Sequence, residues 1–244
     1  MIKVKIPTSL SEITLRQYKH FLKISEDVKS DNFMNAKMVE IFCSLPLAEV
    51  MKLEVNAVDE IVEMISKLFE QKPALIKRFE LNGTDYGFHT GLDNMSLGEY
   101  IDLDNNIGDW PNIERAMNVL YRPVVSKLKE KYSIAEYEAG NEGKILDMPM
   151  DAVLSSVFFF VEFRNGIIAS YDELFGGGGN GSLDEISQFS SKWGWYQSVY
   201  SLADGLITRF ESVTKLGLHE CLLMLTFKKE KTEIENKQMK KKFK

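Results

Sequence analysis

The stretch KRFELNGTDYGFH, from Lys77 to His89, decides the fold class of this 244-residue chain. Apolar residues alternate with polar ones on both sides of the dipeptide Asn82-Gly83. Both residues of that dipeptide tolerate a positive φ, which a two-residue β-hairpin turn requires. The stretch therefore predicts an antiparallel hairpin inside a chain whose other patterns are mostly helical.

Two further segments bear on the predicted sheet. Ile2–Ile6 alternates apolar residues with lysines and ends at Pro7, which is typical of a short, half-buried strand. With the hairpin, this strand would complete a small three-stranded antiparallel sheet. Tyr132–Gly143 is acidic and predicts turns.

Amphipathic periodicity predicts helices on both sides of the hairpin. The predicted helices lie at 11–24, 34–45, within 50–69, from 96, from 111 to a break at Arg122-Pro123, at 150–174, at 193–203, at 207–216, and from about 218 into the C-terminal tail. Residues 150–174 are apolar nearly all round, so we expect a central buried helix there.

A run of four glycines begins at Gly176, in the segment FGGGGNGSLD. Consecutive glycines lose too much backbone entropy to form a regular element, which predicts a solvent-exposed hinge. We therefore expect a mainly helical body with the small sheet over 1–175, a glycine-rich linker over 176–182, and a helical module with a basic tail over 183–244. The predicted fold class is α+β, predominantly α-helical.

The net charge of −6 is distributed unevenly. Residues 228–244 hold eight lysines and three glutamates, so this segment carries +5 and the rest of the chain −11. An acidic body repels phosphate backbones, which argues against a nucleic-acid partner. The longest uncharged apolar stretch, around Ala152–Val161, is about half of the roughly 20 residues that a membrane-spanning helix needs. The N-terminus lacks a signal-peptide pattern, so we expect an intracellular protein without a membrane partner.

Cofactor and metal motifs match only in part. Gly176-x-Gly178-x-x-Gly181 has the letters of a dinucleotide fingerprint but no preceding strand. Asp102–Asp109 resembles a calcium loop without the required glycine and closing glutamate. Cys43 and Cys221 lack zinc-site spacing and are expected to be reduced, buried thiols. We expect no cofactor and no metal, with weak cation binding at Asp102–Asp109 as the alternative.

Nucleophilic catalysis has one candidate cluster, His219-Glu220-Cys221. Residues one and two positions apart on a helix face different directions, so these side chains would not converge on a substrate. The sequence predicts no catalytic residues, and an enzyme is only a residual interpretation.

The segment Trp193-Gly194-Trp195-Tyr196, followed by Tyr200, is unusually rich in aromatic residues. Trp195 and Val199 are four residues apart, as are Tyr196 and Tyr200, so each pair shares a helix face. Core packing is one explanation for these rings. The other is a partner-binding face formed by Trp193, Trp195, Tyr196 and Tyr200, because tryptophan and tyrosine dominate interface hot spots.

Four stretches of the chain resemble tailed-bacteriophage morphogenesis proteins, specifically tail assembly chaperones and baseplate-hub assembly proteins. The stretches are FELNGTDYGFHTGLDNMSLGEYIDLD, AMNVLYRP, MPMDAVLSSVFFFVEF and KWGWYQSVYSLADGLITRFESVTKLGLHECLLMLTFKKEK. The resemblance implies a chaperone or adaptor that binds the tape-measure or another tail protein in the cytoplasm of the infected bacterium, without a cofactor. Self-association is a further expectation. The alternative is a structural virion component of the baseplate, neck or tail.

Overall fold

The computed structural model describes residues 3–27, 30–129, 131–140, 142–175 and 192–242. Contacts divide the chain into two compact units, each assembled from two segments. Unit 1 comprises Met1–Thr90 and Asn105–Phe160, and unit 2 comprises Gly91–Asp104 and Val161–Lys244. The predicted linker 176–182 lies outside the described residues, and the three-part division of the chain stays a prediction.

Unit 1 starts with a small group of helices packed through aromatic side chains. These helices are η1 (Leu10–Glu12), α1 (Leu15–Asp27), α2 (Asp31–Phe42), α3 (Leu47–Val50) and α4 (Val55–Phe69). The Phe42 ring lies 5.3 Å from Phe21 of α1 and 5.7 Å from Phe69 of α4, measured between ring centroids. The predicted amphipathic stripes of these helices therefore form core.

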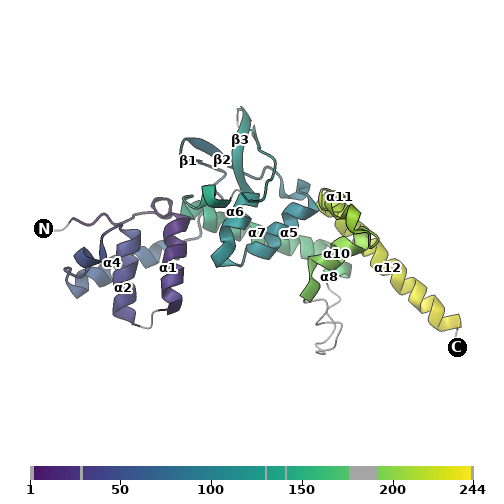
Figure 1. Ribbon diagram of the computed structural model, residues 1–244, viewed down its shortest axis with the longest axis horizontal. Helices are drawn as coiled ribbons and strands as arrows, with labels where there is room; N and C mark the ends of the chain where they lie inside the picture. The colour runs from purple at the N-terminus through teal and green to yellow at the C-terminus, as the bar shows by residue number, and fades with distance from the viewer. Residues whose placement is uncertain (1–2, 28–29, 130, 141, 176–191, 243–244) are drawn as a thin grey trace. The chain divides into compact units, whose positions relative to one another are not determined.

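A four-stranded antiparallel sheet follows, in the order β1-β2-β3-β4 (Figure 1). Its strands are β1 (Arg78–Leu81), β2 (Thr84–Phe88), β3 (Tyr121–Leu128) and β4 (Lys131–Ile134). Asn82 and Gly83 adopt φ values of 51° and 76°, as the predicted two-residue turn requires. The hairpin and the α+β, mainly helical fold class are both confirmed.

The remaining strands are not those that the sequence predicted. Residues 3–8 form no regular element, so the predicted strand at Ile2–Ile6 is wrong over its described part. The free edge of β2 pairs instead with β3, through Phe88 and Tyr121. An alternating pattern shows that a segment suits a strand, but not which partner will supply its hydrogen bonds. The predicted helix break at Arg122-Pro123 lies within β3, and Tyr132 lies in β4 rather than in a turn.

The sheet of unit 1 packs on helical elements that lie between and after its strands. These are η3 (Trp110–Asn112), α6 (Ile113–Leu120), η4 (Glu142–Ile145) and the first part of α7 (Met150–Ser170). Tyr121 is fully buried, and its hydroxyl donates a hydrogen bond of 2.6 Å to the Ile76 carbonyl. The rings of Phe88 and Phe159 meet edge to face with centroids 5.5 Å apart, which joins β2 to α7.

Helix α7 differs from the expected all-round buried helix. Val153, Ser156 and Phe160 are buried, whereas Phe158 and Val161 are exposed. Apolar residues of α7 therefore lie on both a buried and an exposed face of the helix. The prediction that α7 is buried all round is wrong. Among the described helices, α7 alone has the length and composition to cross a membrane, and a third (33%) of the apolar window is buried. Core helices of soluble proteins meet the same two criteria.

Unit 2 consists of helices and short turns. They are η2 (Leu92–Asn94), most of α5 (Leu97–Asn106), the rest of α7, α8 (Asp172–Phe175), α10 (Trp195–Leu202), η5 (Ile207–Arg209), α11 (Phe210–Thr214) and α12 (Leu218–Lys242). Two backbone hydrogen bonds connect its segments: the Leu97 N–H donates to the Leu216 carbonyl at 2.8 Å, and the Leu218 N–H to the Met95 carbonyl at 3.0 Å. Tyr100 is buried among these elements. Residues distant in sequence therefore share one core.

Candidate functional site

The aromatic residues predicted as a partner-binding face lie in unit 2, at the start of α10. Gly194 precedes the helix with a φ of 41°, a conformation that favours glycine. The chain turns at this glycine, and the two tryptophans that flank it contact different neighbours. Trp193 lies against Tyr196, with ring centroids 5.4 Å apart, while Trp195 packs on Tyr100.

Trp195 is held by contacts within unit 2. Its ring meets Tyr100 edge to face at 5.4 Å, and its indole Nε1 donates a 2.9 Å hydrogen bond to Oδ2 of Asp104. The other oxygen of Asp104 lies 2.7 Å from Nε of Arg164, so the carboxylate is paired on both sides. Trp195 therefore anchors α10 to α5, which is the core explanation for this ring.

The other three aromatic residues are exposed. We call Trp193, Tyr196 and Tyr200 the aromatic surface; their exposed fractions are 40%, 49% and 54%. Together with Gln197 they line a hollow of about 370 Å³. Phe210 supports the hollow from α11, with its ring edge to face with Tyr196 at 5.4 Å.

The sequence already held the signal that separates Trp195 from the aromatic surface. Trp195 shares a helix face with Val199, which is buried, whereas Tyr196 shares its face with Tyr200, which is exposed. Treating the four aromatic residues as one face missed this difference. The structure brings Trp193, Tyr196 and Tyr200 together around one hollow. Trp195 instead packs on Tyr100 of α5 and Phe175 of α8.

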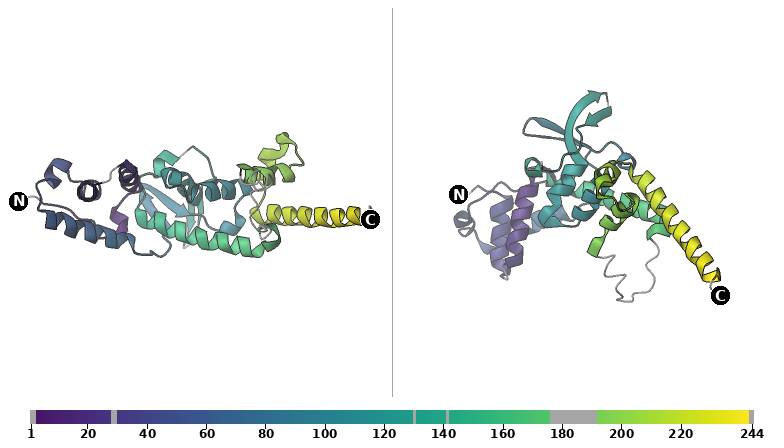
Figure 2. Two further views of the ribbon diagram at one scale, coloured as in Figure 1. Left: turned by 90° about the horizontal axis from the view of Figure 1, so that it is seen from below. Right: turned by 45° about the vertical axis from the view of Figure 1, so that its right-hand side comes forward.

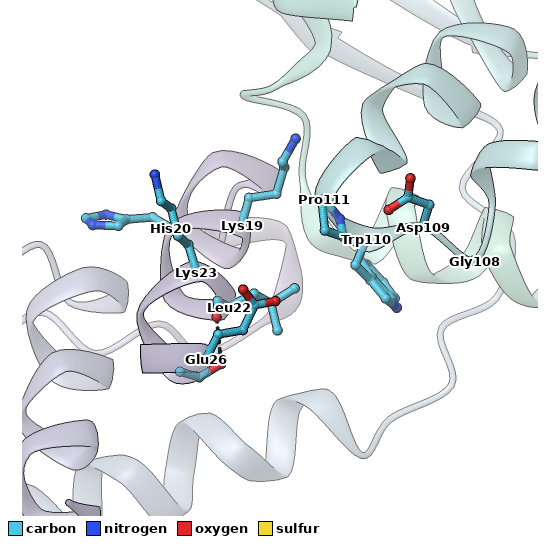
Figure 3. A pocket seen from close by; sticks show the side chains of 10 residues that line it. Lys19, His20, Leu22, Lys23, Glu26, Gly108, Asp109, Trp110 and Pro111 are labelled. Atoms are coloured by element: carbon cyan, nitrogen blue, oxygen red, sulfur yellow. Dashed lines mark hydrogen bonds between the residues drawn. The ribbon is translucent and has the colours of Figure 1, made fainter. Parts of the chain in front are cut away.

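A second hollow, of about 780 Å³, lies in unit 1 between α1 and the turn at η3 (Figure 3). Leu22 contributes to one wall, and Trp110 and Pro111 to the other. Trp110 is fixed edge to face against Tyr18, with ring centroids 5.1 Å apart. No sequence motif marked this hollow, because its two walls are about 90 residues apart in the chain.

Two of the charged side chains around this second hollow already interact with neighbouring residues of unit 1. Lys19 pairs with Glu114, and the Asp109 carboxylate accepts a hydrogen bond of 2.8 Å from Asn112. The hollow offers an apolar wall with charges of both signs at its rim, rather than converging donors for a phosphate or carboxylate. It is therefore the weaker candidate for a specific binding site.

Residues with catalytic potential are arranged as structural groups. The Tyr171 hydroxyl lies 2.9 Å from Nδ1 of His219, whose Nε2 lies 3.3 Å from Asp93. Burial raises the pKa of Tyr171, so this phenol is not activated as a nucleophile. Burial also raises the pKa of the Cys221 thiol to about 11, which leaves it protonated at neutral pH.

In the described part of the chain, no group of three or more His, Cys, Asp or Glu side chains could hold a metal ion. Weak cation binding at Asp102–Asp109 is the predicted alternative. Within that segment, the Asp104 carboxylate already pairs with Arg164 and accepts a hydrogen bond from Trp195. Comparisons of the chain with family models, with curated proteins and with solved structures give no match.

Proposed function

We propose that this protein is an assembly factor for a bacteriophage tail, and that it binds the tape-measure protein or another tail protein through the aromatic surface. The observation that carries a binding role is the exposure of Trp193, Tyr196 and Tyr200 around one hollow. Exposed tryptophan and tyrosine side chains bury large areas at low entropic cost, so they dominate the energy of protein interfaces. Tyr196 is held by ring contacts with Trp193 and Phe210, so little ordering of this ring is needed on binding.

The tail setting is supported by the resemblance of four sequence stretches to phage morphogenesis proteins, including the stretch 192–231 that contains the aromatic surface. A tape-measure protein is largely helical and exposes apolar stripes before the tube forms around it. A shallow aromatic hollow suits one side chain of such a stripe, and several weak contacts along one partner would add up by avidity. The protein would act in the cytoplasm of the infected bacterium.

The binding role is tested by capture of the co-expressed tape-measure protein. The double variant Tyr196→Ala/Tyr200→Ala should weaken capture by about 30-fold, corresponding to roughly 2 kcal/mol. Phe33→Ala, which removes an aromatic ring that is 40% exposed on α2, is the control and should bind normally. Unchanged capture by the double variant would contradict the proposal.

Mass spectrometry of purified virions separates an assembly factor from the alternative structural component. An assembly factor should be absent from virions, whereas a baseplate, neck or tail component should be present in a fixed copy number.

A further inference from the structure

The long C-terminal helix α12 has an apolar stripe that is separate from the aromatic surface. Its first turns are buried through Leu218, Cys221, Leu222 and Leu225. On the opposite side, Leu223, Phe227 and Ile234 are each more than half exposed. At about 100° per residue, these three side chains lie within about 40° of one another on the helix surface. They form a narrow line, which we call the α12 stripe.

The second half of α12 lies beside no other described element of unit 2 (Figure 2). Every residue from Lys231 to Lys242 is exposed. The beginning of the helix is fixed, because Lys228 lies 2.8 Å from the Asp204 carboxylate and Lys229 contacts the Glu173 carbonyl. A helical extension without tertiary contacts is marginal in water, so a partner that covers the stripe would stabilise it.

The charges around the α12 stripe identify the chemistry of that partner. The segment Lys228–Lys242 contains seven lysines and three glutamates. Lys237, Lys240, Lys241 and Lys242 make no ion pair with any described residue. A second copy of the same basic helix would be repelled, whereas an acidic helix would be attracted.

The width of the stripe argues for a helical partner rather than a lipid surface. Helices that lie on membranes carry a broad apolar face, whereas a narrow line at spacings of four and seven residues is typical of a coiled-coil seam. Glu230 and Glu233 lie between Phe227 and Ile234 in the sequence, and Glu235 follows Ile234. Among the described residues, the unpaired positive charge of α12 therefore lies C-terminal to these glutamates, at Lys237 and Lys240–Lys242.

We infer that α12 is a second docking surface, which binds an acidic amphipathic helix of a partner protein through Leu223, Phe227 and Ile234, with the terminal lysines pairing with its carboxylates. This surface does not depend on the aromatic surface or on the phage assignment. The two surfaces lie on different elements of unit 2, so each can be removed without altering the other.

The test uses the full-length protein and two synthetic peptides of four heptads. Both peptides carry leucine at positions a and d; one carries glutamate at positions e and g, the other lysine. Repulsion between like charges disfavours pairing of either peptide with itself, so helicity gained on mixing reports binding. Titration by fluorescence anisotropy should show the acidic peptide binding at least tenfold more tightly than the basic one, and more weakly as salt is raised.

Variants then assign the binding to α12. Phe227→Ala should weaken binding of the acidic peptide at least tenfold, and reversing Lys240, Lys241 and Lys242 to glutamate should make the basic peptide the better ligand. Ile207→Ala, at an exposed apolar residue outside α12, is the control and should bind like the parent protein.

Three results would overturn the inference. The first is equal affinity for both peptides, or no affinity for either. The second is a stable dimer in light scattering that Phe227→Ala dissociates, since the stripe would then be covered by a second copy. The third is Phe227-dependent binding to phosphatidylserine vesicles in place of the acidic peptide. A Tyr196→Ala/Tyr200→Ala variant that loses tape-measure capture but keeps peptide binding would leave the inference intact.

Discussion

At the scale of single residues, adjacent aromatic side chains have opposite roles. Trp195 donates its indole hydrogen bond to Asp104 and meets Tyr100 edge to face, whereas Trp193 and Tyr196 keep much of their surface in water. Stability and binding should therefore separate cleanly between positions only one or two residues apart.

Trp195→Ala should lower the free energy of unfolding by about 3 kcal/mol, because it removes a packed ring and leaves the Asp104 carboxylate without one partner. Trp195→Phe keeps most of the ring contact and should cost about half as much. Trp193→Ala, the matched exposed tryptophan, should stay within about 0.5 kcal/mol of the parent protein. Urea denaturation followed by circular dichroism measures all three, and equal losses at both tryptophans would refute the assignment of Trp195 as an anchor.

The two cysteines give a pH-dependent prediction. Burial raises the pKa of Cys43 and of Cys221 to about 11, from 9.0 for an ordinary thiol. Both thiols are protonated in the folded and unfolded states below pH 9, and their stabilising contribution is fully present there. Between pH 9 and 11 the unfolded chain loses these protons first, so stability falls as the pH rises.

Denaturation midpoints at pH 8 and pH 10 measure this effect. Cys43→Ala/Cys221→Ala should lose less stability between the two pH values than the parent protein does. In the folded protein, both thiols should react with iodoacetamide roughly 100-fold more slowly at pH 8 than in urea, as two pKa units imply. Rapid labelling of either thiol in the folded protein would contradict the assigned burial.

At the scale of elements, the sheet of unit 1 depends on a glycine beneath a tyrosine. A Cβ added at Gly87 of β2 would lie 2.4 Å from Cε2 of Tyr132. Tyr132, in β4, extends across the sheet and donates from its hydroxyl to the carbonyls of Phe88, at 2.8 Å, and Lys77, at 3.1 Å. The ring therefore bridges strands that are not sheet neighbours.

Gly87→Ala should destabilise unit 1 by roughly 2 kcal/mol, since Tyr132 must move and lose these hydrogen bonds. In a Tyr132→Ala background the same change should cost less than about 0.5 kcal/mol, because the obstacle is gone. Additive losses in the double-mutant cycle would show that the two residues do not compete for space.

In contrast to Gly87→Ala, the change Gly166→Ala is expected to increase stability. Gly166 lies inside α7, is exposed, and has open space where a Cβ would be added. Alanine should therefore raise the free energy of unfolding by roughly 0.5–1 kcal/mol, because it restricts the unfolded chain and favours the helix. A lower melting temperature for this variant would contradict the described environment.

Local signals predicted most of the elements, and non-local ones escaped prediction. The Asn82-Gly83 turn and the helical stripes are encoded within a few residues, and the structure has them. Strand β3 was missed because Tyr121–Leu128 pairs with β2 more than thirty residues away, and Arg122-Pro123 resembles a helix end. The aromatic surface was predicted by composition, and the helix face that Trp195 shares with Val199 separates Trp195 from it. The hydrogen-bond partner of Trp195 could not be predicted, because Asp104 lies 91 residues away.

At the scale of the whole molecule, neither unit is one continuous piece of sequence. Unit 2 takes Leu97, Tyr100 and Leu103 from the middle of the chain, and all three are buried. A fragment that begins at the predicted linker would therefore lack part of its own core.

Residues 183–244 expressed alone should remain without cooperative tertiary structure, because the partners of Trp195 and Leu218 in 91–104 are missing. Joining residues 91–104 to 161–244 through a flexible linker should restore a cooperative melting transition. Proton NMR dispersion and thermal circular dichroism distinguish the two fragments. A well-folded 183–244 fragment would support the three-part division predicted from the sequence.

Because unit 2 is built from two separate segments, its first segment is synthesised well before the second. Tyr100 leaves the ribosome roughly 100 residues before Trp195, and at about 5–20 residues per second it waits about 5–20 s for its partner. For most of that interval, until the segment from Val161 onward is synthesised, the later elements of unit 2 cannot cover the apolar side of α5. Slowing translation after residue 104, for example with rare codons, should prolong this exposure and lower the soluble yield, whereas the same codons placed after residue 218 should have little effect.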